Sequence, residues 1–501
     1  MKQFTCSWKC FATSLLIFTL LCITMVMVAG LVIIPVMYIQ KWEYDYDQFG
    51  IVFTAEPDST KMFMYKWDDR KINGTGVLTY VGNVSCIEKS ITELNINDTQ
   101  THINKCIQSS FCSQDGQRKC IPMKYRFKQK HRISLYFLIT DELTMLNNFN
   151  ETYTDQLLNT TDNTISNYFH HRDVVNYTEI DGTSHAVSTW VTVNMKYIKK
   201  SQYYEDLVGV LYLGPVSTQL SYCQYASSDG HLHLYGINYK VQTENLMCGG
   251  WNESWRNITA SLVDKRDRNY TYKHPCLPKG YTWTVSAKHL FSSSCTVLDY
   301  KEATLQFVGS PDTNSCAKKI VSLVKTISKP YEGNFTTLGR FNKVFKFFGN
   351  TTSVNSSASS WTQYNNTLNK FCGLTWSEIK TQYNVSDDDD DEVMWSRRCF
   401  EGQLVRSLLM ISYRFSSSDK WTINTTLGSH DTKHWSLGYM TQQTGNNITS
   451  PPLRTRPYSS TSLILSLVEL VILLVLFSLF LISVVHVSCT DKNRNGYIAI
   501  S

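Results

Sequence analysis

The residues best suited to a chemical role in this sequence are five cations that occupy every second position of residues 124–132. They are Lys124, Arg126, Lys128, Lys130 and Arg132. Because side chains alternate across a strand, all five project from one face if the stretch is extended. A row of positive charge suits a polyanion, so we predict binding to a sulfated glycan or an anionic lipid. The alternative interpretation is an edge strand whose cations only discourage aggregation.

Catalytic motifs offer no comparable signal. The sequence contains no GxSxG, HExxH, P-loop or GxGxxG pattern. His231 and His233 would share one strand face, but no third metal ligand accompanies them. We therefore predict a non-enzymatic protein without a cofactor or a metal.

A carboxylate interrupts the apolar run 462–487, where Glu469 is the acidic residue. An ionisable side chain inside a bilayer costs about 2.5–3.5 kcal/mol on insertion scales, so it usually faces a partner helix, a pore or water. Glu469 therefore predicts a partner membrane protein. The alternative is a carboxyl group that is protonated or reached by water near the membrane edge.

The last residues contain a Tyr-x-x-aliphatic pattern preceded by glycine, formed by Gly496, Tyr497 and Ile500. An extended peptide of this kind fills two pockets of a clathrin adaptor. The short tail resembles those of lysosomal membrane glycoproteins and of the late-endosomal tetraspanin. We predict a sorting signal.

Two apolar runs define the expected topology, at residues 11–39 and 462–487. Each is long enough for a transmembrane helix, since about 20 apolar residues cross a bilayer. We expect the first to be an uncleaved signal anchor; a cleaved signal peptide is the alternative. Residues 1–10 and 488–501 are then cytoplasmic, the latter carrying the sorting signal.

Glycosylation acceptors place the middle of the chain outside the cytoplasm. Sixteen Asn-x-Ser/Thr sites lie between the apolar runs, at Asn73, Asn83, Asn97, Asn150, Asn159, Asn176, Asn252, Asn257, Asn269, Asn334, Asn350, Asn355, Asn365, Asn384, Asn424 and Asn447. Eleven cysteines share this region and predict a disulfide framework with one thiol left over. They are Cys86, Cys106, Cys112, Cys120, Cys223, Cys248, Cys276, Cys295, Cys316, Cys372 and Cys399.

The expected fold is a two-span membrane protein with a β-rich α+β, disulfide-bonded and heavily N-glycosylated ectodomain. Alternating or apolar stretches predict strands, at residues 132–140, 185–198, 206–216, 231–241, 281–290 and 303–309. The spacing of Ile320, Leu323, Val324 and Ile327 predicts a helix. We expect a β-rich part at 40–348, a Ser/Thr/Asn-rich linker at 349–369, a second part at 370–447 and a stalk at 448–461. No internal repeat is evident.

The chain plan, a span at each end of a large glycoprotein domain, resembles class B scavenger receptors, two-span channels and viral envelope glycoproteins. The net charge of +6 is too small to indicate a nucleic-acid partner. We predict a receptor that binds ligands through its ectodomain and cycles between the cell surface and endosomes or lysosomes. A channel or transporter-associated subunit and a viral attachment or entry glycoprotein are the alternatives.

Overall fold

The computed structural model describes most of the chain between residues 47 and 446 and short segments outside it. The described residues are 19, 23–32, 47–68, 71–87, 96–112, 120–122, 133–146, 156, 159–165, 175–199, 206–226, 230–264, 270–296, 303–326, 333–349, 353–355, 358–386, 388–415, 421–424, 434–446, 464, 467–480 and 482–483. Residues 47–450 form one compact unit, and the two terminal segments form another. None of the helices in the described segments is long and apolar enough to cross a membrane. The two-span topology stays a prediction.

The first half of the compact unit is built on a five-stranded mixed sheet in the order β3-β2-β1-β6-β7. β1 pairs antiparallel with β2 and parallel with β6, which in turn pairs parallel with β7. The strands are β1 (Asp47–Ala55), β2 (Thr60–Asp68), β3 (Thr79–Ile87), β6 (Ile133–Thr140) and β7 (Val175–Ile180). We call this half the first lobe.

The central strand β1 is apolar on both sides because helices cover both faces of the sheet. Phe49, Ile51 and Phe53 share a core with Ile103 of α2 (Ile96–Ser109). The intervening Val52 packs instead with residues of α15 (Trp435–Asn446). Alternation of side chains across the strand thus supplies two cores from one apolar run.

A second, seven-stranded sheet follows the order β10-β11-β9-β8-β15-β17-β16. Its strands are β8 (Gly209–Leu213), β9 (Thr218–Ala226), β10 (Leu232–Leu234), β11 (Ile237–Leu246), β15 (Gly333–Gly339), β16 (Ser353–Asn355) and β17 (Trp421–Asn424). The hairpin β8–β9, its antiparallel neighbour β11 and the parallel strands β15 and β17 repeat the arrangement of β1–β2, β3, β6 and β7. The compact unit therefore contains an internal structural repeat that the sequence analysis did not detect.

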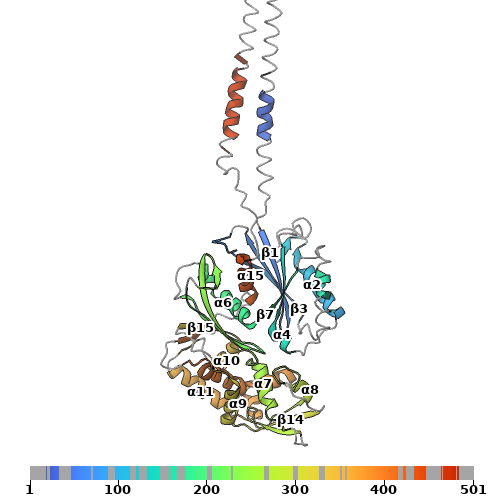
Figure 1. Cartoon of the computed structure of the whole chain (residues 1–501), viewed down its shortest axis with the longest axis vertical. Coiled ribbons are helices and arrows are strands. Elements are labelled where there is room, and N and C mark those ends of the chain that lie inside the picture. Colours follow the sequence, from blue (N-terminus) through green and yellow to red (C-terminus); the bar gives the residue numbers. More distant parts are fainter. Residues whose placement is uncertain are drawn as a thin grey trace, which may run out of the picture. The chain divides into compact units, whose positions relative to one another are not determined.

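Two helices pack against each other between the sheets, α6 (Gly182–Ile198) and α15 (Figure 1). The contact is close because Gly438 has no side chain: a Cβ atom there would fall on the carbonyl oxygen of Ser188. The prediction of a strand at 185–198 is wrong. Its Val and Thr residues suggested a strand, but Asp181 caps the segment by accepting a hydrogen bond from the Ser184 N–H, 2.6 Å, and most of the helix is buried.

The remaining elements form a lobe of helices beside a small sheet in the order β12-β14-β13 (Figure 1). They are β12 (Thr271–His274), β13 (Thr282–Ser286), β14 (Thr304–Gly309), α7 (Trp251–Ala260), α8 (Ala287–Leu290), α9 (Thr313–Leu323), α10 (Arg340–Gly349), α11 (Ala358–Cys372), α12 (Trp376–Tyr383), α13 (Asp389–Ser396) and α14 (Arg398–Ser407). The predicted helix around Ile320 is α9. α11 occupies much of the segment 349–369 that was expected to be a linker, and its Tyr364 and Leu368 are buried in the core.

Disulfide bonds hold this helical part together, as the cysteine content predicts. Three pairs are formed within it, Cys248–Cys295, Cys276–Cys316 and Cys372–Cys399. Cys106 and Cys120 are also disulfide-bonded. The coarse prediction of an α+β fold with disulfides is confirmed.

Candidate functional site

Each of the two large sheets contains a hairpin closed by a similar turn. Residues 56–60 read Glu-Pro-Asp-Ser-Thr between β1 and β2, and residues 214–218 read Gly-Pro-Val-Ser-Thr between β8 and β9. The Glu56 N–H donates to the Ser59 carbonyl over 3.0 Å, and the Gly214 N–H donates to the Ser217 carbonyl over 2.9 Å. Both turns follow the carboxyl ends of strands that have parallel neighbours. In open α/β sheets this is where ligands bind.

A buried carboxyl group joins the two halves of the repeat. Glu142 follows β6 at the start of α4 (Asp141–Leu146) and is only 5% exposed. Its Oε1 accepts hydrogen bonds from the Ser217 N–H, 3.2 Å, and from the Ser217 hydroxyl. Burial, reinforced by the negative charges of Glu56 and Asp141, raises the pKa of Glu142 to about 8. This carboxyl group is therefore protonated at neutral pH.

The other carboxylate of the site is held in its ionised form. Burial opposes ionisation of Glu56, but the electrostatic interaction with His434 and hydrogen bonds with His434 and Trp435 lower the pKa of the carboxyl to about 2. Glu56 Oε1 accepts from His434 Nε2 over 2.9 Å and from the Trp435 indole over 2.7 Å. Two carboxyl groups of the same site thus carry different charges at pH 7.

A buried histidine completes the arrangement. His185, on the first turn of α6, is 6% exposed, and its Nδ1 lies 2.8 Å from Gln219 Oε1. The Gln219 amide nitrogen donates to the Ser217 hydroxyl, so its oxygen acts as the acceptor and His185 Nδ1 carries the proton. Nε2 then keeps a lone pair. Burial lowers the pKa of His185 and keeps the ring neutral.

We call Glu56, Glu142, His185, Ser217 and Gln219 the inter-sheet cluster. Tyr212 lies beside it: its ring contacts His185 with 5.3 Å between the ring centroids. Burial, chiefly, and the charge of Glu56 raise the pKa of Tyr212, so its hydroxyl stays protonated. The cluster thus offers a neutral base, a neutral acid and several hydroxyl groups in a largely desolvated space.

The structure does not bring the residues predicted from the sequence to this cluster. The cationic stretch, Lys124 to Arg132, and the sorting signal, Gly496, Tyr497 and Ile500, lie outside the described residues. Glu469 lies in the helical segment 467–480 and is exposed. Their roles stay predictions.

No member of the inter-sheet cluster was predicted from the sequence. One signal could have revealed it: the pattern x-Pro-x-Ser-Thr occurs at 56–60 and again at 214–218, each time between two apolar stretches. Such a repeat of a turn indicates two equivalent hairpins. It would have placed Ser59 and Ser217 at equivalent positions.

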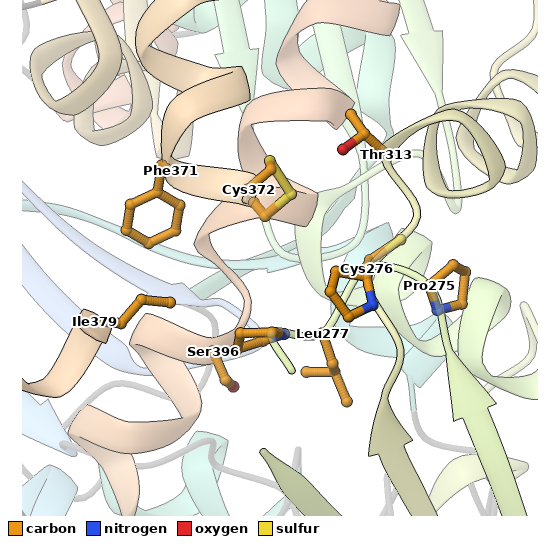
Figure 2. A pocket seen from close by; sticks show the side chains of 11 residues that line it. Pro275, Cys276, Leu277, Thr313, Phe371, Cys372, Ile379 and Ser396 are labelled. Atoms are coloured by element: carbon orange, nitrogen blue, oxygen red, sulfur yellow. A yellow bond between two sulfur atoms is a disulfide. The ribbon is translucent and has the colours of Figure 1, made fainter. Parts of the chain in front are cut away.

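A small pocket elsewhere in the helical part has a different character (Figure 2). It shares no lining residue with the inter-sheet cluster. Apolar side chains and disulfide sulfur atoms line it, including Leu277, Phe371 and Ile379. Since no charged residue lines it, this pocket is a poor site for a phosphate group.

Comparisons with known proteins identify relatives over most of the chain. Residues 40–456 match the GDA1/CD39 (nucleoside phosphatase) family. Ectonucleoside triphosphate diphosphohydrolase 3 of Mus musculus is 25% identical over 443 residues, which cover 81% of this chain and 80% of the mouse protein. Ectonucleoside triphosphate diphosphohydrolase 1 of Bos taurus is 24% identical over 500 residues, covering 90% of each chain.

A solved structure supports the fold. The crystal structure of nucleoside triphosphate hydrolases from Neospora caninum superposes with a TM-score of 0.51 at 10% sequence identity. The match covers 82% of this chain and 95% of that one.

These findings overturn the predicted function. The relatives are named as hydrolases, so the prediction of a non-enzymatic receptor is wrong. Short motifs such as GxSxG or HExxH belong to other kinds of active site. The polar groups of this site come instead from two sheets and several segments that are distant in the sequence. The chain belongs to the GDA1/CD39 nucleoside phosphatase family.

Proposed function

We propose that this chain binds a nucleoside phosphate at the inter-sheet cluster and hydrolyses its terminal phosphate group at the extracellular or lumenal face of a membrane. The observation that carries the proposal is the contact between the two halves of the repeat: Glu142 of the first half accepts hydrogen bonds from Ser217 in the turn of the second half, and the charge of Glu56 in the turn of the first half acts on Glu142. The names of the relatives supply the substrate class. Trafficking to endosomes or lysosomes through the Tyr497 signal stays a separate prediction.

The charge states of the cluster are compatible with an anionic substrate. The carboxyl group of Glu142 is neutral at pH 7 and can donate its proton to a phosphate oxygen. The ionised carboxylate of Glu56 is engaged by hydrogen bonds with His434 and the Trp435 indole.

His185 is the group that can activate water. With Nδ1–H held by Gln219, its Nε2 can accept a proton from a water molecule that attacks phosphorus. The lowered pKa of His185 ensures that this lone pair is available at neutral pH. The same hydrogen bond fixes the orientation of the ring, so Gln219 acts as a positioning residue.

Phosphoryl transfer commonly uses a divalent cation held by oxygen ligands, which stabilises the developing charge. The inter-sheet cluster does not fit such an ion. Glu142 is protonated, and the ionised Glu56 is engaged by His434 and Trp435. Within the described segments, no three side chains of His, Cys, Asp or Glu converge into a metal-binding group. We derive no step through a metal.

The experiment is a phosphate-release assay on the full-length chain in detergent, with ATP and ADP as substrates. His185→Asn keeps a donor for Gln219 but removes the base, so we expect kcat to fall about 10²-fold or more with little change in KM. His231→Ala, which alters an exposed histidine, is the matched control and should retain activity. Equal activity of His185→Asn and the wild type would refute the role of His185. Nucleotide binding without phosphate release from the wild type would refute hydrolysis.

A further inference from the structure

A second feature of the molecule is an arginine that packs on two tryptophans in the helical part. Arg397 is the residue before α14, and its guanidinium carbon lies 4.9 Å from the ring centroid of Trp255 and 5.1 Å from that of Trp283. The two rings are tilted by 50° with 5.9 Å between their centroids. They come from α7 and β13, so three distant segments build this contact.

The charge of Arg397 has no carboxylate partner. Its guanidinium makes no hydrogen bond or ion pair with any residue in the part of the chain that the structure describes. Glu401, the acidic residue that acts on it most strongly, is already engaged: Oε1 by Arg340 and Oε2 by Arg398, 3.1 Å away. Burial, together with the charges of Arg340 and Arg256, lowers the pKa of Arg397 to about 10. The guanidinium is therefore still charged at pH 7.

Positive charge exceeds negative charge around this arginine. Four guanidinium groups interact there, from Arg256, Arg340, Arg397 and Arg398, against the carboxyl groups of Glu253, Glu401 and Asp391. Burial raises the pKa of Glu253, and its Oε2 accepts a hydrogen bond from Ser293 over 2.5 Å. A buried charge without a counter-charge is costly, and structures usually supply a partner for it.

Hydrogen-bond donors are also in surplus at the same place. The Nε1 atom of Trp255 and the Nε atom of Arg398 are buried and find no acceptor among the described residues. Both residues are more than nine-tenths buried. The unmatched N–H of Trp255, whose ring contacts the Arg397 guanidinium, points to a missing acceptor at this place.

We propose that Arg397, backed by Trp255 and Trp283, anchors a binding site for an oxyanion, in the form of a phosphate ester, a sulfate ester or a carboxylate. The aromatic contacts form no hydrogen bonds with the guanidinium, so its N–H groups can still donate two parallel hydrogen bonds to an oxyanion. Arg397 is half-buried rather than sealed in the core, so a small anion can reach it. This site is independent of the inter-sheet cluster and of the proposed hydrolysis.

The test measures anion binding to the full-length chain in detergent, by calorimetric titration and by thermal unfolding at constant ionic strength. Sodium phosphate, sulfate and acetate are the probes, and chloride is the reference. We expect at least one probe to bind saturably and to raise the Tm by about 1–3 °C at ten times its Kd. The preferred probe identifies the ester or carboxylate class.

Variants assign the binding to Arg397. Arg397→Gln should abolish the rise in Tm, whereas Arg406→Gln, a change within α14, should retain it. If Arg397→Gln does not fold, Arg397→Lys keeps the charge but loses the paired hydrogen bonds, and its Kd should be at least about tenfold weaker. No saturable binding to the wild type, or unchanged binding by the Arg397 variants, would overturn the proposal.

Discussion

Replacing Glu142 by Gln should change how stability depends on pH. In the folded chain the pKa of this carboxyl is raised from 4.5 to about 8, chiefly by burial. Between these values the folded state holds a proton that the unfolded state has lost, so the free energy of unfolding falls as pH rises. The contribution is fully present below pH 4.5 and is lost as pH passes through about 8.

The magnitude follows from proton linkage. Each pH unit within this window costs about 1.4 kcal/mol for one proton, so the wild type should lose on the order of 2–3 kcal/mol between pH 5.5 and 7.5 through Glu142 alone. Glutamine does not titrate, and its side-chain oxygen can still accept from Ser217. Relative to the wild type, Glu142→Gln should therefore become more stable as pH rises.

Thermal unfolding of the full-length chain at several pH values measures this difference. The gap in Tm between Glu142→Gln and the wild type should widen by a few °C from pH 5.5 to 7.5. Glu179→Gln, which changes an exposed carboxylate, is the control and should follow the wild type at every pH. Parallel curves for Glu142→Gln and the wild type would show that Glu142 ionises normally and would refute this account of the cluster.

Three further changes probe the pairing of charges, the helix contact and the disulfides. Glu56→Gln should lower the free energy of unfolding at pH 7 by about 1–3 kcal/mol, because it removes the carboxylate that pairs with His434. The loss should shrink as pH falls from 4.5 towards the folded pKa of about 2, since the wild type then loses the stabilisation that this carboxylate provides. A pH-independent loss in denaturation experiments would contradict this. Gly438→Ala should cost about 1–3 kcal/mol or more by forcing α6 and α15 apart, whereas Gly445→Ala on the same helix, whose nearest neighbour would lie 3.7 Å away, should be neutral or slightly stabilising. Equal Tm values for these two variants would refute the close helix contact. Replacing both Cys372 and Cys399 by Ser should cost about 2–5 kcal/mol, read as a lower Tm, and an unchanged Tm would mean that the bond is dispensable.

Much of the secondary structure can be predicted from the sequence because it depends on local patterns. Five of the six predicted strand regions contain observed strands, since their apolar runs are short and bounded by turns. α6 was mistaken for a strand because β-branched residues such as Val191 and Thr192 dominate it. The two-sided burial of α6 between the sheets decides its structure, and a local pattern does not contain that information.

The candidate site was harder to predict for a different reason. Glu142 and Ser217 are 75 positions apart, and Glu56 and His434 are 378 apart, so only the folded repeat brings them together. Burial then changes their protonation states, which no spacing rule reveals. The repeated Pro-x-Ser-Thr turn was the available sequence signal.

Hydrogen–deuterium exchange of the full-length chain with a non-hydrolysable ATP analogue tests the central claim most directly. Because the claim places the phosphate chain between the two hairpin turns, we predict slower exchange in peptides that span residues 56–60 and 214–218. Peptides from the pocket around Leu277 and Phe371 should not change. Unchanged exchange at both turns with a saturating analogue, or protection confined to other segments, would contradict the proposed nucleotide site.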